Sequence, residues 1–298
     1  MWIVGIWLAF VGGAIGSFMN VVIYRMPAGL SVVHPGSRCS RCEHPIRWYD
    51  NLPVLSWFLL GGKCRDCGAS FSIRYAAVEA VVAALFLTLA GVELFTAGAN
   101  LPQRAIGIVD AGWSQNAARF WPVYAYHLML ICSLICVAMI QFDGHRLPGA
   151  LLWAPVLCGW IAPLACPAMY PVPLLTIDAS TMGMLVRFAT LVDSGTGMAT
   201  GAAIGWIART CVAGTLAGCQ PQRTPALQPS LWAGALCGLY LGWQAALIVG
   251  GVATLLHLVL LTLFRQRNAA QRWPWSALLT GLTVVYILTW KPILEIFP

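Results

Sequence analysis

Long apolar runs recur along this 298-residue chain, and they restrict its fold more than any other feature. A helix needs about 20 consecutive apolar residues to cross a bilayer. Only 9% of the residues are charged, too few to coat a soluble fold, which excludes a cytosolic enzyme, a disordered chain and a disulfide scaffold. The sequence predicts an all-α polytopic membrane protein with about eight transmembrane helices. The runs fall near 2–24, 76–98, 121–140, 149–168, 182–208, 231–248, 250–264 and 276–290.

The basic residues predict how the chain is oriented in the membrane. The first of them, Arg25, follows the first apolar run, whereas a secretory signal peptide carries its positive charge before that run. We therefore expect an uncleaved first span with the N-terminus outside. Most of the 17 Lys and Arg residues fall on one side of the predicted layout, which is cytoplasmic by the positive-inside rule. Those on that side are Arg25, Arg38, Arg41, Arg47, Lys63, Arg65, Arg74, Arg146, Arg209, Arg223, Arg265, Arg267 and Arg272.

Local composition predicts two of the connections. Gly250 and Gly251 stand where the run at 231–248 gives way to the run at 250–264, and they predict a tight reversal there. Residues 99–120 are polar and rich in Gly and Ala, which predicts an outer loop with a short interfacial helix. The predicted membrane orientation explains the formal charge of +7, because the basic residues gather on the cytoplasmic side. We therefore expect no nucleic-acid partner.

A polar insert at 25–75 separates the first span, 1–24, from a transmembrane domain over 76–298. It contains two Cys-x-x-Cys pairs, Cys39 with Cys42 and Cys64 with Cys67, with 21 residues between the pairs. Two such pairs supply the four thiolates of a tetrahedral site, and a reducing cytoplasm disfavours disulfides. We expect a cytoplasmic insert with structural Zn²⁺, since four thiolates leave no open position for water. Iron and four unligated cysteines are the alternatives.

Several motifs resemble those of the prepilin leader peptidases, the bifunctional aspartic peptidase/N-methyltransferases of type IV pilus and type II secretion systems. The resemblance implies a multi-pass protein of the bacterial inner membrane, pilin-like precursors as substrates, and S-adenosylmethionine as a cofactor if methyl transfer is retained. The matching stretches are Gly16–Pro27, Tyr49–Trp57, Ser72–Tyr75, Val78-Glu79, Asp143–Pro148, Gly201–Trp206 and Gly238–Gln244, with the family's late motif reduced to Trp273-Pro274-Trp275-Ser276.

The peptidase chemistry of that family needs two carboxylates that share a proton near the cytoplasmic face. Aligning Leu147-Pro148 with the family motif puts its first catalytic Asp on Gln141, and aligning Gly242–Gln244 puts the second on Ser230. Gln and Ser form hydrogen bonds, but neither acts as a general base near neutral pH. Asp143 is the best remaining catalytic candidate, although a solvated turn residue is the simpler interpretation.

The other carboxylates near spans are less well placed for this chemistry. Glu79 opens the second span, where it pairs with Arg74 or Arg25 or belongs to a methyl-transfer site. Asp178 and Asp193 fall near the outer face of the predicted layout.

Two functional hypotheses follow from the resemblance. In the first, the chain is an active prepilin peptidase with a relocated dyad that includes Asp143. In the second, it has lost proteolysis and keeps methyl transfer, or it binds pilin-like leaders as a scaffold. A transporter or channel has little support, because no chain of charged residues crosses the predicted bilayer.

Overall fold

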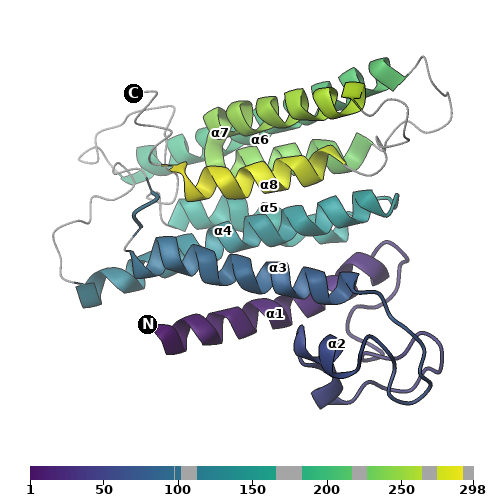
Figure 1. Ribbon diagram of the computed structural model, residues 1–298. Coiled ribbons are helices and arrows are strands. Elements are labelled where there is room, and N and C mark those ends of the chain that lie inside the picture. Colours follow the sequence, from purple (N-terminus) through teal and green to yellow (C-terminus); the bar gives the residue numbers. More distant parts are fainter. Residues whose placement is uncertain (97, 102–112, 166–182, 217–226, 264–273, 291–298) are drawn as a thin grey trace. The chain divides into compact units, whose positions relative to one another are not determined.

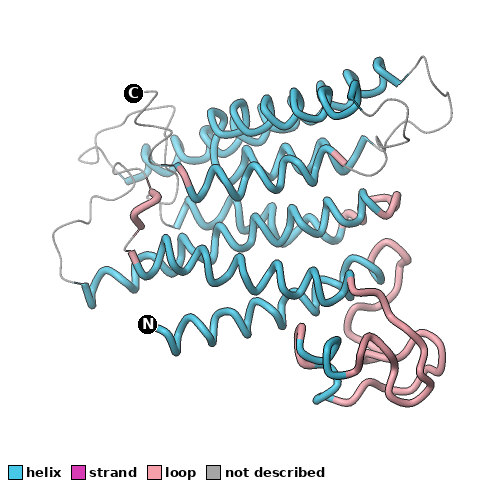
Figure 2. The backbone as a smooth tube through the Cα atoms, viewed as in Figure 1, coloured by secondary structure: helices cyan, strands magenta, loops and turns pink. Residues whose placement is uncertain are grey.

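The computed structural model describes residues 1–96, 98–101, 113–165, 183–216, 227–263 and 274–290. The chain divides into two compact units, Met1–Phe95 and Thr96–Pro298. All regular structure in the described residues is helical apart from two isolated β-bridges, which confirms the all-α prediction (Figures 1 and 2).

The first unit is built on two antiparallel helices, α1 (Trp2–Arg25) and α3 (Arg74–Leu89), the latter continuing as the π-helix η2 (Ala90–Phe95). The short helices η1 (Trp48–Asn51) and α2 (Leu55–Leu59) lie in the insert between them. Glycines let α1 and α3 approach closely, since a Cβ at Gly16 would lie 2.8 Å from the Cα of Glu79. Small residues allow such backbone contact between membrane helices.

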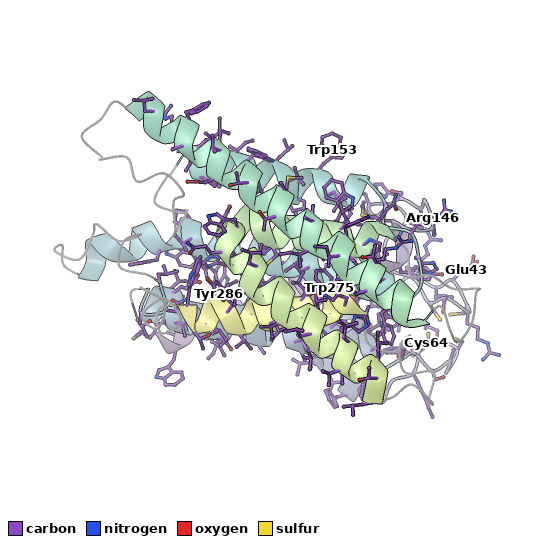
Figure 3. The ribbon with its side chains drawn as sticks, turned by 90° about the horizontal axis from the view of Figure 1, so that it is seen from above. Glu43, Cys64, Arg146, Trp153, Trp275 and Tyr286 are labelled. Atoms are coloured by element: carbon purple, nitrogen blue, oxygen red, sulfur yellow. The ribbon has the colours of Figure 1, made fainter. Side chains whose placement is uncertain are left out.

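The second unit contains α4 (Trp113–Phe142), α5 (Ala150–Ala165), α6 (Gly183–Leu216), α7 (Leu227–Leu263) and α8 (Trp275–Leu288). Trp275 and Tyr286 lie toward opposite ends of α8 (Figure 3). Helix α4 begins at Trp113, so the second part of the predicted outer loop is the start of a long helix. Residues 102–112 of that loop lie outside the described part of the chain.

Helix α7 is a hairpin of two helical limbs that reverses at Gly242, whose φ of 90° and ψ of 170° are not helical. A Cβ at Gly238 would lie 3.3 Å from the Cβ of Ala246, although eight residues of continuous helix would separate them by about 12 Å. The predicted reversal at Gly250-Gly251 is therefore wrong. The turn requires the positive φ that glycine adopts without steric cost, whereas Gly250 packs within the second limb against Ile204.

A row of glycines brings α6 and the first limb of α7 into backbone contact. A Cβ at Gly201 would overlap the carbonyl of Gly234, and a Cβ at Gly238 would overlap that of Gly197. The same seam continues to Gly205, which faces the backbone of Ser230. In a bilayer, helices associate through close packing rather than through exclusion of water, so this seam fixes the register of α6 against α7.

Four helical segments of the described chain are long and apolar enough to cross a membrane: Trp2–Arg25, Arg74–Phe95, Phe120–Phe142 and Gln228–Leu263. Helices α5 and α8 are apolar but shorter. The second of the four ends at Phe95, three residues before the predicted boundary at 98. The full set of about eight spans stays a prediction.

We expect Gly201→Ala to destabilise the second unit, because its methyl group would force α6 away from α7. Overpacking of this kind costs about 1–3 kcal/mol. Gly251→Ala is the matched control, since a Cβ at this helical glycine meets nothing within 4 Å. Thermal unfolding in detergent should show a lowered midpoint for Gly201→Ala and an unchanged or raised one for Gly251→Ala. Equal midpoints would contradict the proposed role of the seam.

Candidate functional site

The two Cys-x-x-Cys segments form hairpins with the same hydrogen-bond pattern. The N–H of Cys39 donates to the carbonyl of His44 at 3.0 Å, and the N–H of Cys64 donates to that of Ala69 at 2.8 Å. Each hairpin is closed by an isolated antiparallel bridge, Arg38 with Pro45 and Lys63 with Ser70. The chain thus builds the same cysteine-presenting turn twice.

Both turns need a residue with positive φ directly after the second cysteine. In the second hairpin this residue is Gly68, with φ of 68°, and in the first it is Glu43, with φ of 57°. An L-residue with a side chain is destabilised in this region by about 1–2 kcal/mol. The first hairpin therefore carries backbone strain that the second one avoids.

The hairpins bring the four cysteine sulfur atoms together within 4.8 Å of one another. The Sγ atoms of Cys39 and Cys67 are 3.8 Å apart, and those of Cys42 and Cys64 are 4.0 Å apart. A disulfide requires about 2.05 Å, whereas tetrahedral zinc with bonds of about 2.3 Å places its sulfur ligands about 3.8 Å apart. The donor set and its spacing fit a metal ion held by four thiolates.

Local electrostatics makes the two thiols of the first hairpin unequal. The backbone N–H groups of Cys42 and Arg41 lower the pKa of the Cys39 thiol to about 6. The N–H of His44 acts in the same direction on Cys42, but burial and the neighbouring thiols raise its pKa to about 12. Four thiolates therefore need a cation to stabilise their combined negative charge.

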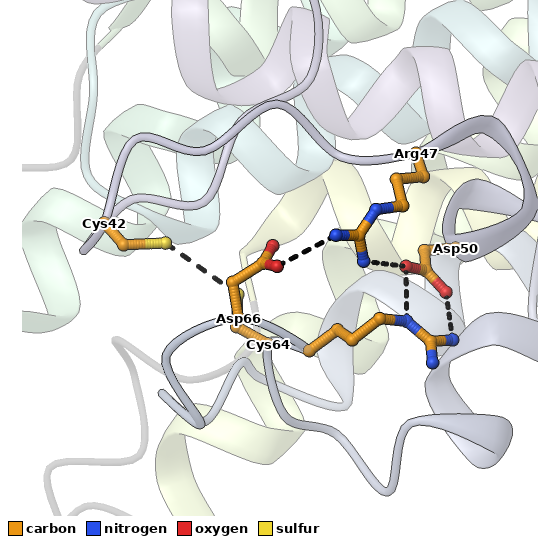
Figure 4. Close-up of polar contacts among 6 residues, drawn as sticks. Cys42, Arg47, Asp50, Cys64 and Asp66 are labelled. Carbon is orange, nitrogen blue, oxygen red and sulfur yellow. Dashed lines mark hydrogen bonds and ion pairs between the residues drawn. The ribbon is translucent and has the colours of Figure 1, made fainter.

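An ion-pair network ties the second hairpin to the segment that follows the first (Figure 4). Asp50 accepts two hydrogen bonds from the guanidinium of Arg65, at 2.8 and 2.6 Å, and Arg47 lies 3.1 Å from Asp66 and 3.9 Å from Asp50. Bidentate pairs of this kind fix orientation as well as distance. Because Arg65 and Asp66 stand between Cys64 and Cys67, the network helps to position the second thiolate pair.

The Arg65 guanidinium holds the pKa of Asp50 below its usual range. A carboxyl with a lowered folded-state pKa stabilises the fold above its unfolded-state value, and that contribution is lost as pH falls through the lowered pKa. The network therefore contributes fully at neutral pH and weakens in acid.

Other motif residues of the first unit have structural contacts. The carboxylate of Glu79 accepts a hydrogen bond of 2.7 Å from the N–H of Val54, whose φ is 62°. The guanidinium of Arg25 donates to the carbonyls of Ser31, Pro35 and Gly36. The two side chains thus hold opposite parts of the insert against the helical pair.

In the second unit, Gln141 at the end of α4 and Ser230 at the start of α7 come together, although 89 positions separate them in the sequence. The amide Nε2 of Gln141 lies 3.3 Å from Ser230 Oγ, and Ser276 Oγ of α8 donates to Gln141 Oε1. Ser230 and Ser276 are buried. We call these three residues the amide–hydroxyl cluster. Sequence reasoning did not identify Ser276 as a member, although its Trp-Pro-Trp-Ser stretch resembles the family's late motif.

Two carboxylates of the second unit, Asp143 and Asp193, lie among its described residues. Asp143 is exposed in the turn that ends α4, where Gly144 has φ of 73° and the N–H of Asp143 donates to the carbonyl of Met139. Asp193 is buried on α6, 12 residues or about 18 Å of helix from Gly205, which faces Ser230. Asp178 lies outside the described residues.

Comparison with known proteins identifies the family. The family model described as the bacterial peptidase A24 N-terminal domain matches residues 10–92. A prepilin leader peptidase/N-methyltransferase of Myxococcus xanthus is 30% identical over 202 residues, which cover 68% of this chain and 46% of that protein. The chain belongs to the prepilin leader peptidase/N-methyltransferase family.

Other relatives agree with this assignment and limit its extent. A type 4 prepilin-like proteins leader peptide-processing enzyme of Escherichia coli is 32% identical over 204 residues, which cover 61% of this chain and 63% of that enzyme. A prepilin leader peptidase/N-methyltransferase of Klebsiella pneumoniae is 43% identical over 93 residues, covering 29% of this chain and 40% of that protein. The matched region thus spans less than two thirds of each relative, and no solved structure matches the chain.

The metal prediction is tested by the zinc content of the purified protein. Cys39→Ser should abolish stoichiometric zinc, because a three-thiolate remnant no longer closes the tetrahedral shell. Cys132→Ser is the control, since this cysteine lies on α4 of the second unit. Elemental analysis after gel filtration measures both. Retention of full zinc by Cys39→Ser, or zinc loss by Cys132→Ser, would contradict the assignment.

Glu43→Gly should strengthen the first hairpin, because glycine adopts the required positive φ at little steric cost. We expect slower loss of metal to a chelator and a gain of about 1 kcal/mol in stability. Gly68→Ala, at the equivalent position of the second hairpin, should have the opposite effect. Metal release monitored with a colorimetric chelator compares the two, and faster release from Glu43→Gly would count against the strain argument.

Proposed function

We propose that this chain is a non-proteolytic member of its family that binds pilin-like precursors. The observation that carries the proposal is the amide–hydroxyl cluster: the two positions matched to the family's catalytic aspartates meet in space, but they carry an amide and a hydroxyl. Three helix ends meet at this cluster. None of its three side chains is charged, whereas the reaction uses a pair of carboxyl groups.

The chemical argument concerns the attacking water. An aspartic peptidase uses one ionised carboxylate to remove a proton from water and one protonated carboxyl to polarise the scissile carbonyl. The Gln141 amide does not accept a proton near neutral pH, and a serine hydroxyl needs an adjacent base before it can react. The Gln141–Ser230 pair can therefore orient a bound peptide through hydrogen bonds but cannot perform this acid–base cycle.

Methyl transfer is the second candidate function, and the match of residues 10–92 to the bacterial peptidase A24 N-terminal domain favours it. Two of the relatives are named as both leader peptidases and N-methyltransferases. In this proposal the first unit, with Zn²⁺ as a structural ion, binds S-adenosylmethionine and methylates an N-terminus that another enzyme has exposed.

The proposed setting is the bacterial inner membrane, with the N-terminus outside and about eight spans. The insert at 25–75 and its four cysteines lie in the cytoplasm in this arrangement, on the side where the basic leader of a pilin-like precursor would lie. The apolar helices of both units support a membrane location.

One experiment separates these possibilities. The purified protein is reconstituted in vesicles with a pilin-like precursor, or with the same precursor already cleaved, and with S-adenosylmethionine; product masses are then measured. We expect the intact precursor to be recovered uncleaved. A gain of one methyl group on the cleaved substrate would support methyl transfer, and an unchanged mass with retained binding would support the scaffold form. Leader removal that Asp143→Ala abolishes would overturn the proposal in favour of the relocated dyad.

Restoring the carboxylates tests whether the cluster occupies the position of a peptidase centre. The double substitution Gln141→Asp and Ser230→Asp places two acids within hydrogen-bond reach, where close negative charges separate their pKa values. We expect slow leader cleavage by this variant and none by the control pair Gln141→Asn and Ser230→Thr. Mass spectrometry of the precursor is the measurement, and cleavage by the control pair would contradict the placement.

A further inference from the structure

The ends of α1 and α3 define a membrane boundary for the first unit. Helix α1 finishes with Tyr24-Arg25 and α3 begins with Arg74-Tyr75. The amide of Asn20 donates to the carbonyl of Tyr75 at 3.1 Å, so these ends lie side by side. Tyrosine and arginine are typical of the headgroup level, and the apolar parts of both helices extend away from it.

Part of the insert returns past this boundary, alongside the helices. Pro53 contacts α1 at Gly13, where an added Cβ would lie 2.9 Å from the Pro53 Cβ. Gly13 stands 12 residues before Arg25, about 18 Å along the helix. The N–H of Val54 is bound by Glu79, which lies five residues or about 8 Å into α3. Figure 1 agrees, since α2 lies beside the C-terminal half of α1 rather than beyond its end.

Most of the irregular N–H groups of this segment are bonded within the protein, as contact with lipid requires, because no water is available there. The N–H groups of Leu55 and Ser56 donate to the carbonyls of Pro53 and Leu52. After α2, the N–H groups at positions 60–63 donate to carbonyls at 56, 58, 57 and 60, respectively. Together with the Val54–Glu79 hydrogen bond, these contacts give partners to the N–H groups at positions 54–56 before α2 and 60–63 after it.

The side chains of α2 are arranged with the apolar ones outward. Leu55, Phe58 and Leu59 are 59%, 66% and 77% exposed. Ser56 is buried, and the indole N–H of Trp57 donates to the carbonyl of Phe71. A face of three large apolar side chains next to transmembrane helices is disfavoured in water but suits acyl chains. Lys63, four residues after the end of α2, has an exposed side chain that can reach the headgroups.

From this geometry we infer that residues 52–62 form a re-entrant segment in the leaflet on the side of the four cysteines. The outward face of α2, formed by Leu55, Phe58 and Leu59, contacts lipid acyl chains. The segment anchors the cysteine hairpins against the membrane surface, since Asp50 and Cys64 stand at its two ends in the sequence. The Glu79 carboxylate and the Gly13 surface hold it there.

Photo-crosslinking tests this placement. The full-length protein carrying Phe58→p-benzoylphenylalanine is reconstituted in vesicles of phosphatidylethanolamine and phosphatidylglycerol, irradiated, and examined by mass spectrometry. The same substitution at Phe18, which is 54% exposed on α1, is the positive control. Trp48, which is 80% exposed in the insert, is the matched control for a water-facing aromatic residue. Zinc content reports whether each variant retains the folded hairpins.

We expect phospholipid adducts at position 58 at a yield comparable to that at position 18 and several-fold above that at position 48. Absence of lipid adducts at position 58, with strong adducts at position 18, would overturn the inference. A crosslink from position 58 to a polypeptide instead of lipid would also overturn it, because the apolar face would then be a protein-docking surface.

Discussion

Hydrocarbon offers nothing to which a peptide N–H or C=O can bond, so a chain that crosses a bilayer must satisfy its backbone internally. Helical hydrogen bonding meets most of this requirement in both units, and several residues discussed above stand where helices stop or bend. Gly242 reverses α7, the carboxylate of Glu79 binds the N–H of Val54, and Gly144 closes the turn after α4.

The cysteine hairpins solve a different problem, because a small insert has too little apolar surface to hold its own fold. The repeated turn, the bidentate Asp50–Arg65 pair and a metal ion would together replace a hydrophobic core. The ion-pair network helps to set the positions of the cysteines. Arg65 and Asp66, which pair with Asp50 and Arg47, lie between the two cysteines of the second hairpin. The strain at Glu43 shows that the fold tolerates a poor local conformation where the cysteine positions require it.

The amide–hydroxyl cluster joins three helices of the second unit through neutral polar side chains. Three helix ends converge on Gln141, and two of the three side chains are buried serines. Neutral hydrogen-bonding groups avoid the free-energy penalty of burying carboxylates, and they give α4, α7 and α8 a polar junction. In the function that we propose, this junction takes the place of a catalytic acid pair.

Run length and cysteine spacing were sufficient to predict the helical class and the gathering of four thiols, because hydrophobic periodicity and metal-ligand spacing act locally along the chain. Motif alignment also matched Gln141 and Ser230 to paired positions. Their contact, the participation of Ser276 and the reversal at Gly242 depended on which helix faces pack together. In sequence, the Gly250-Gly251 pair and Gly242 are both compatible with a turn. Only the packing of α7 against α6 shows that the chain reverses at Gly242. The position of α2 along α1 likewise depends on the contact of Pro53 with Gly13, two residues that lie 40 positions apart in the sequence.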